Sequence, residues 1–184
     1  LVKSDTVVVA GEITTNAILD HEKIARQAVK EIGYTDPSEP FCDTTLKIIS
    51  LITRQSNEIS QGVTATTSQS GDQGAGDQGI MFGYATDESD ELMPLPILLA
   101  HKLTKGLSEA RKAGRVSWLR PDSKSQVSVL YEDNQPKEVT TVVVSTQHKE
   151  IPISRVRREV IAKIVKPSIP ARLLDKNTIY HVNP

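Results

Sequence analysis

The chain has 184 residues, of which 38% are hydrophobic and 24% charged, and its formal net charge at pH 7 is -1. This length suits one ordinary domain or two small ones, and the near-neutral charge gives no basic field, so neither nucleic acid nor a membrane surface is expected as a partner. The single Cys42 excludes an internal disulfide, no run approaches the roughly 18 apolar residues of a membrane span, and residues 1–5 lack a signal-peptide layout, so a cytoplasmic location is expected.

The first part of the chain predicts a strand, a helix and a second strand. Residues 6–15 are β-branched and apolar enough for a buried strand. Asp20 is placed to cap a helix whose apolar residues share one face, and Gly33 is placed to end it. Residues 44–52 predict the second strand. A unit of this size is too small to be a complete domain, so we expect its partner strands to lie outside this sequence.

A polar segment follows. Between residues 55 and 76 the composition shifts to Gln, Ser, Thr, Gly and Asn, and Ile59 and Val63 are its only large apolar residues. Connections of this length without internal structure are uncommon inside compact domains, and they are often either lids over active sites or linkers. The residues alone leave both alternatives open.

The remaining residues predict a second unit with six elements. These are strand 80–86, a long helix over 96–113, strands 125–131 and 139–146, a helix through 153–164 that Pro167 stops, and strand 178–182. The order β-α-β-β-α-β predicts an α+β fold, with helices packed on one face of a mixed or antiparallel sheet.

Residues 74–79, Gly-Ala-Gly-Asp-Gln-Gly, match the G-x-G-x-x-G pattern of dinucleotide-binding sites. That fingerprint requires a strand before it and a helix after it, so that the pyrophosphate lies at the helix N-terminus. Here a polar loop precedes and a strand-like run follows, which argues against a Rossmann site. The glycines allow close approach of a ligand, and Asp77 offers a carboxylate that suits an ammonium group or hydrated Mg²⁺. A Gly-rich turn with a solvated Asp77 fits the composition equally well.

The block formed by residues 74–88 resembles the first conserved motif of S-adenosylmethionine synthetases (methionine adenosyltransferases), unbroken through Phe-Gly-Tyr-Ala-Thr. The resemblance continues, in order and spacing, at residues 92–97, 100–103, 118–127 and 144–148. Upstream, residues 11–15 resemble the family's Gly-Glu-Ile/Leu-Thr-Thr strand end. Residues 55–63 resemble its Gln-Ser-Pro-Asp-Ile-x-Gln-Gly-Val loop, with Asn-Glu in place of Pro-Asp, whereas residues 64–73 match no family pattern.

Members of this family join the sulfur of methionine to C5′ of ATP, displace tripolyphosphate and hydrolyse it, using Mg²⁺ and K⁺. The resemblance implies this activity, in which alignment and charge stabilisation lower the barrier and no general base is needed. The methionine-binding residues that the resemblance implies are Glu12, Gln55 and Asp77. The ATP-binding residues that it implies are Asp122, Ser123 and Lys124. Without the resemblance, Asp-Ser-Lys after Arg-Pro is merely a turn.

The resemblance also implies that the polar segment is a gating loop, which closes over the site and excludes water. Its residues are Gln55, Ser56, Asn57, Glu58, Ile59, Ser60, Gln61, Gly62, Val63, Thr64 and Ala65. We expect the loop to be disordered without ligand, since few apolar anchors offset the entropy of ordering it. The implied layout is the end of an N-terminal domain over 1–54, the gating loop over 55–73 and a central domain over 74–184, with the C-terminal domain absent.

Other parts of the family's site have no counterpart in these residues. They include the His-Pro-Asp-Lys segment, the acidic K⁺ ligand and the Gly-Gly-Ala-Phe-Ser-Gly-Lys-Asp motif. We therefore expect no metal ligand within this sequence and no activity from it in isolation. The implied assembly is a homodimer or a dimer of dimers that binds ATP and L-methionine. A non-catalytic homologue and a generic nucleotide-binding module are the alternatives, although the presence of Asp77, Asp122 and Lys124 argues against a decayed site.

The remaining titratable residues predict no further site. The histidines lack an i, i+4 pair, so metal binding through them is not expected; they are His21, His101, His148 and His181. Basic residues between positions 155 and 166 are mixed with Glu159, which predicts a solvated helix face.

Overall fold

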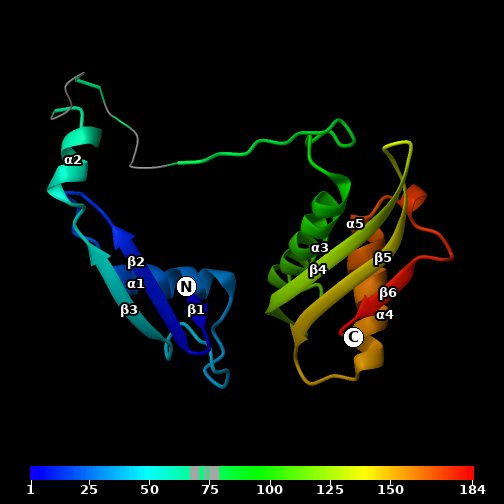
Figure 1. Ribbon diagram of the computed structural model, residues 1–184. Helices are drawn as coiled ribbons and strands as arrows, with labels where there is room; N and C mark the ends of the chain where they lie inside the picture. Colours follow the sequence, from blue (N-terminus) through cyan, green and yellow to red (C-terminus); the bar gives the residue numbers. More distant parts are fainter. Residues whose placement is uncertain (67–70, 73, 75–78) are drawn as a thin grey trace. The chain divides into compact units, whose positions relative to one another are not determined.

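The computed structural model describes residues 1–66, 71–72, 74 and 79–184 (Figure 1). The chain divides into two compact units, Leu1–Phe82 and Gly83–Pro184. Each unit combines helices with a three-stranded sheet that contains both a parallel and an antiparallel pair. This arrangement confirms the predicted α+β class.

The sheet of the first unit has the order β1-β2-β3. β1 (Val2–Lys3) pairs antiparallel with β2 (Thr6–Glu12), and β2 runs parallel to β3 (Lys47–Thr53). Parallel strands need a crossover connection, and α1 (His21–Ile32) supplies it (Figure 1). The predicted strand over 6–15 is therefore three residues shorter at its end.

Both predicted ends of α1 are confirmed. The Asp20 carboxylate accepts a hydrogen bond from the Lys23 main-chain N–H at 2.9 Å, which satisfies a donor of the first turn. Gly33 follows the last helical residue with a φ of 114°, in the left-handed region that glycine adopts without strain. The local sequence thus determines where this helix begins and ends.

The core of the first unit is small. Val7, Val29 and Leu46 are its buried members, and Val7 is the one buried residue of β2. Ile24 and Ile32, which were expected on the packed face of α1, are 54% and 49% exposed. The prediction of a buried first strand is wrong for this unit, because three strands and one helix cover too little of each other.

A short helix, α2 (Asn57–Val63), occupies part of the segment that was expected to lack structure. The Ser56 hydroxyl accepts a hydrogen bond from the Ile59 N–H at 3.3 Å, and Glu58 lies in the first turn. A side-chain cap and an acidic first turn both stabilise a helix start. The expectation of disorder is therefore wrong for residues 57–63.

The sheet of the second unit has the order β4-β5-β6. β4 (Leu119–Glu132) and β5 (Gln135–His148) form a long antiparallel hairpin, and β6 (Ile179–Val182) runs parallel to β5. Asp133 and Asn134 join the hairpin with φ values of 51° and 61°, as the left-handed two-residue hairpin turn requires. Both hairpin strands are longer than predicted.

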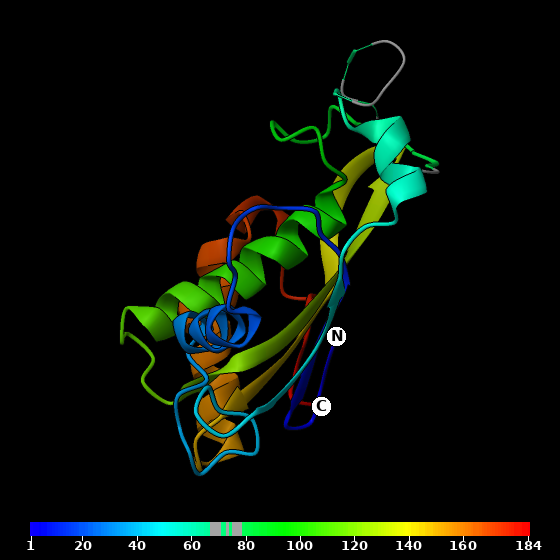
Figure 2. The same ribbon diagram turned by 90° about the vertical axis from the view of Figure 1, so that its left-hand side faces the viewer.

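Helices cover one face of this second sheet (Figure 2). α3 (Leu95–Lys112) lies beside a segment in which α4 (Ile153–Val160) continues through a π-helical stretch (Ile161–Val165) into α5 (Lys166–Ser168). A short 3-10 turn, Ala171–Leu173, precedes β6. The segment ends at Ser168, one residue after the Pro167 that was predicted to stop it. Pro167 has no main-chain N–H to donate to the preceding turn, and the π-helical stretch lies directly before it. No helix in the described part of the chain is both long and apolar enough to cross a membrane.

Residues 79–86 contain neither helix nor strand, so the predicted strand over 80–86 is wrong. Ile80, Met81 and Phe82 are 81%, 92% and 90% exposed. A strand forms only when a neighbouring strand takes its main-chain hydrogen bonds, and the Thr86 N–H instead bonds the nearby Leu92 carbonyl at 3.2 Å. The observed order of the second unit is therefore α-β-β-α-β.

Candidate functional site

Two of the residues expected to bind methionine lie at one edge of the first sheet. Glu12 is the last residue of β2 and pairs with Thr53, the last residue of β3, and Gln55 follows two positions later. The Ile13 N–H donates to the Thr53 carbonyl at 2.9 Å, which keeps the two segments together beyond the strands. Glu12 is exposed and Gln55 half-buried. Open α/β sheets bind ligands beyond the carboxyl ends of their parallel strands, which is this edge.

A hollow of about 260 Å³ lies at the same edge. It is lined by Ile13, Thr15, Ala17, Leu19, His21, Ile52, Thr53 and Arg54. His21 Nδ1 lies 3.1 Å from Ser50 Oγ, which fixes the imidazole at the start of α1. Sequence reasoning gave His21 and Arg54 no role, because only the parallel pairing brings α1 and the end of β3 to one place.

Asp77, the third expected methionine ligand, lies outside the described residues, which omit 67–70, 73 and 75–78. Its role therefore stays a prediction. The expected gating loop over 55–65 is described, with α2 at its centre and a hydrogen bond from the Thr64 N–H to the Ser60 carbonyl at 3.0 Å. Whether it closes over a ligand also stays a prediction.

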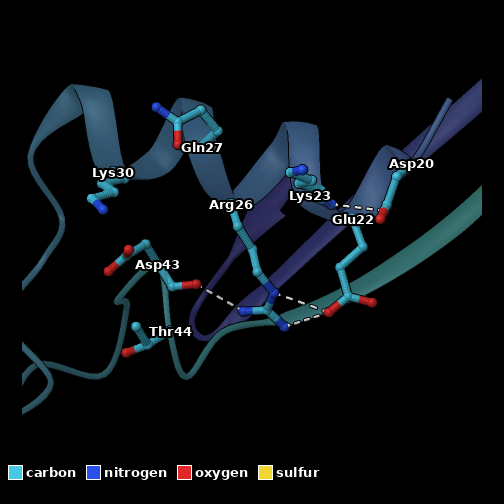
Figure 3. Close-up of a pocket in the computed structure, with 8 residues that line it drawn as sticks. All are labelled: Asp20, Glu22, Lys23, Arg26, Gln27, Lys30, Asp43 and Thr44. Atoms are coloured by element: carbon cyan, nitrogen blue, oxygen red, sulfur yellow. Dashed lines mark hydrogen bonds and ion pairs between the residues drawn. The ribbon is translucent and has the colours of Figure 1, made fainter.

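A larger hollow of about 560 Å³ lies along α1 (Figure 3). The Arg26 guanidinium crosses it, donating to the Asp43 carbonyl at 2.8 Å and the Leu46 carbonyl at 3.0 Å. Glu22 accepts from the same guanidinium at 2.7 Å. These bonds tie α1 to the chain that enters β3. The expected substrate residues are not among those that line this hollow, so Arg26 is assigned a structural role.

In the second unit, the expected ATP-binding residues lie where the β4–β5 ladder is irregular. Regular pairing stops between Leu119 and Ser123, and residues 120–122 together face a single residue of β5. Pro121 has no N–H to give to the ladder. Bulges of this kind bend a strand and redirect its side chains, and Asp122 is exposed at this point.

Lys124 lies on the face of the sheet that the helices leave open. The Ser125 hydroxyl donates to the Ala100 carbonyl at 2.7 Å, so Ser125 faces α3. Because successive strand residues point to opposite faces, Lys124 and Gln126 point away from the helices. Lys124 pairs with Ser145 of β5 and is exposed. A flexible ammonium in this position suits the charge of a phosphate.

Trp118 is anchored immediately before the irregular stretch. Its indole N–H donates to Glu159 Oε2 at 3.1 Å, and its carbonyl accepts from the Lys149 N–H at 2.8 Å. The indole also meets the His148 ring edge-on, with the ring centroids 6.3 Å apart. Three contacts thus hold the chain at the residue before β4, two positions before the ladder becomes irregular.

Glu159 on α4 is the partner that sequence reasoning missed. Its side chain is only 13% exposed and accepts from Lys163 at 2.8 Å and from Arg155 at 2.7 Å. Hydrogen bonds from Lys163, Arg155 and Trp118, in that order of importance, lower the pKa of the Glu159 carboxyl to about 2. The helix face expected to be merely solvated therefore holds an ionised carboxylate that bonds Trp118, 41 positions away and immediately before β4.

The residues that follow the 79–86 segment are anchored to the hairpin and α3 of the second unit. The Tyr131 hydroxyl donates to the Glu88 carboxylate. Burial and then this hydrogen bond raise the pKa of Tyr131 to about 12. Lys102 of α3 lies 3.2 Å from the Glu91 carboxylate. Although 79–86 lack a strand, the residues after them are therefore fixed to this unit.

Within the described ranges, no group of three or more His, Cys, Asp and Glu side chains converges to hold a metal ion. The described residues alone do not form a complete site for Mg²⁺ or K⁺, both of which take several oxygen ligands.

Comparison with known proteins assigns both parts of the chain to one family. Residues 1–57 match the family model described as S-adenosylmethionine synthetase, N-terminal domain, and residues 72–184 match S-adenosylmethionine synthetase, central domain. Curated proteins named S-adenosylmethionine synthase align with the whole chain. Those from Akkermansia muciniphila, Sorangium cellulosum and Desulfosudis oleivorans are 50%, 49% and 46% identical over 190, 185 and 185 residues.

The chain spans 48%, 44% and 48% of the lengths of these three relatives, which is less than half of each. It corresponds to a partial region of proteins that are S-adenosylmethionine synthases. On these matches, which cover residues 1–57 and 72–184 in the expected order, the chain belongs to the S-adenosylmethionine synthetase family.

Proposed function

We propose that the protein carrying this chain is a methionine adenosyltransferase. The methionine sulfur attacks C5′ of ATP, a C–S bond forms as the C5′–O bond breaks, and tripolyphosphate leaves and is hydrolysed to pyrophosphate and phosphate. The observation that carries this proposal is the whole-chain identity of 46–50% to three proteins named S-adenosylmethionine synthase. A sulfur nucleophile needs no base, so the residues act by placement and charge.

The methionine half of the site is proposed to lie at the edge of the first sheet. There the Glu12 carboxylate suits the substrate ammonium group, and the Gln55 amide can donate to its carboxylate. Asp77 is proposed as a second carboxylate near the ammonium group. The shared position of Glu12 and Gln55 at the carboxyl ends of β2 and β3 supports this assignment.

The ATP half is proposed to lie on β4. Asp122 can accept a hydrogen bond from a ribose hydroxyl, and Lys124 can stabilise the charge that develops on the departing polyphosphate. Ser123 alternates to the face that Ser125 occupies, so we propose that it contributes through its main chain. The irregular ladder and the exposure of Asp122 and Lys124 support a role in binding.

We also propose the layout implied by the family: residues 1–54 as the end of the N-terminal domain, 55–73 as the gating loop and 74–184 as the central domain. The gate would move as a unit around α2, whose cap and short helix give it local order. Closure would exclude water while the sulfonium forms.

Mg²⁺ and K⁺ are proposed as cofactors on the strength of family membership. When bound they would neutralise polyphosphate charge, and no step is assigned to them because the described residues form no ion site. A homodimer or a dimer of dimers is proposed as the assembly. The face of the first sheet that α1 leaves open supports association, since Ile49 and Leu51 are 46% and 58% exposed on it. A cytoplasmic location without nucleic-acid or membrane partners completes the proposal.

The test uses the full-length protein with ATP, L-methionine, Mg²⁺ and K⁺. We expect S-adenosylmethionine, pyrophosphate and phosphate to form, and no product from residues 1–184 alone. Binding of both substrates without product would refute the enzyme and favour a non-catalytic homologue. Binding of adenylate without methionine would favour a generic nucleotide-binding module.

A further inference from the structure

The side chain of Asn183 takes the place of a strand residue at the end of the second sheet. β6 ends at Val182, which pairs with Val144 of β5, and the Asn183 N–H still donates to the Val144 carbonyl at 2.9 Å. The φ of Asn183 is 45°, which turns the main chain out of the sheet. Its amide then bonds both main-chain groups of Thr146: Oδ1 accepts from the N–H at 2.8 Å, and Nδ2 donates to the carbonyl at 3.0 Å.

This contact lies where the ATP-binding segment rejoins the sheet. Thr146 is the residue of β5 that pairs with Ser123, where regular pairing resumes after residues 120–122. Successive strand residues turn their main-chain N–H and carbonyl groups to opposite edges of the strand. The main-chain groups of Thr146 point to the Asn183 amide, so those of its neighbour Ser145 point to β4, where Ser145 pairs with Lys124. The amide therefore holds β5 from the side opposite β4, one residue from the pair that contains Lys124.

Neither β4 nor β6 can replace this support. β4 lies at the edge of the described sheet, so β5 is the strand neighbour that fixes its position there. Pairing between β5 and β6 ends at Val182, and Thr146 is only 5% exposed. Without the amide, the main-chain N–H and carbonyl of Thr146 would lose the partners that they have among the described residues, in a largely buried place, which is unfavourable.

We propose that Asn183 is a positioning residue for the nucleotide: it fixes β5 at Thr146 and thereby places Asp122 and Lys124 against ATP. This inference rests on the proposed function, which assigns ATP to those two residues. Asparagine suits the position because it adopts left-handed φ values readily and carries one acceptor and one donor group. Glycine would keep the turn and lose both bonds, whereas aspartate would keep only the acceptor.

The test compares Asn183→Gly with Asn134→Gly in the full-length protein. Asn134 is a matched control, since it is also an asparagine at positive φ, 61°, but it lies exposed at the hairpin tip. We expect Asn183→Gly to raise the ratio of the KM for ATP to the KM for methionine about tenfold, because two hydrogen bonds that orient the ATP segment are lost. Asn134→Gly should leave the ratio within about twofold. A purely structural role would lower the melting temperature without changing the ratio.

An unchanged ratio in a folded Asn183→Gly protein would overturn the proposal. If that variant does not fold, Asn183→Asp takes its place, and an unchanged ratio there has the same meaning. If the wild-type protein forms no S-adenosylmethionine, the proposed function fails separately. The positioning role is then decided by the affinity for ATP, measured by calorimetry. Weaker binding of ATP by Asn183→Gly than by Asn134→Gly supports the role. Equal affinities in the two variants, or no detectable binding by the variants and the wild type, overturn it.

Discussion

The two units of the chain are built alike and supported very differently. Both combine a three-stranded mixed sheet with helical cover on one face, yet among the described residues the buried core holds twenty residues in the second unit and three in the first. The second unit has a hairpin of two 14-residue strands with two helical segments across it, whereas the first has one helix over seven-residue strands. A candidate site on the second unit therefore rests on its own core. The edge that carries Glu12 and Gln55 depends on few internal contacts.

The largest expected effect tests this difference in support directly. Leu103→Ala in the second unit removes a fully buried side chain from a large core and should lower the free energy of unfolding by about 3–4 kcal/mol. Leu46→Ala, equally buried in the small core, should cost about 2 kcal/mol, because its surroundings collapse more readily. Native-state hydrogen exchange measures each unit separately. A larger loss for Leu46→Ala would contradict the comparison.

The next effect concerns the substrates. Lys124→Met should lower kcat/KM for ATP about 100-fold, equivalent to about 2.7 kcal/mol, because the ammonium proposed to stabilise the polyphosphate is lost. Steady-state kinetics at saturating methionine provide the measurement. Lys137→Met is the control, since Lys137 is an exposed lysine of the same hairpin that pairs with Glu132. Equal losses of kcat/KM in the two variants would show that ATP does not bind at this face of the sheet.

Glu12→Gln should affect the other substrate. We expect the KM for methionine to rise about tenfold and the KM for ATP to stay within about twofold, because the charge-assisted hydrogen bond proposed between Glu12 and the ammonium group becomes neutral. Glu31→Gln, on exposed α1 surface, is the control and should change neither constant. A rise in the KM for ATP alone would show that the two units do not divide the substrates in the way proposed.

The sequence predicts structural features that depend on neighbouring residues better than features that depend on residues far apart in the chain. The ends of α1 were predicted correctly because Asp20 and Gly33 act on their immediate neighbours. The strand over 80–86 was wrong because its apolar pattern says nothing about the strand it must pair with. The bonds from Glu159 to Trp118 and from Asn183 to Thr146 left no local signal, since they join residues 41 and 37 positions apart.

The candidate site residues were predicted from a family resemblance and not from local sequence patterns. Asp122, Lys124 and Glu12 carry ordinary side chains in ordinary contexts, and only the family resemblance singled them out. The structure adds the parallel pairing that brings Glu12 near Gln55 and the irregular ladder around Asp122. Both depend on strand register, which composition and periodicity do not determine.

The smallest expected effect is on acid stability. The pKa of Glu159 lies near 2 in the folded protein and near 4.5 when unfolded, so its ionised form stabilises the fold above about pH 4.5. That contribution should fade as the pH falls from about 5 to 2. Glu159→Gln should flatten the pH dependence of unfolding in this range, followed by fluorescence of Trp118, the one tryptophan of the sequence. Glu109→Gln, an exposed helix carboxylate, should leave the pH dependence as it is.

We propose that the protein carrying this chain forms a sulfonium from methionine and ATP. The most direct test follows the methyl group of ¹³C-methyl-methionine by NMR in the full-length protein with ATP, Mg²⁺ and K⁺. We expect the methylthio signal to be replaced by a methylsulfonium signal as pyrophosphate and phosphate appear in equal amounts. ATP breakdown without a sulfonium signal, or an unchanged methionine signal in the presence of bound ATP, would contradict it.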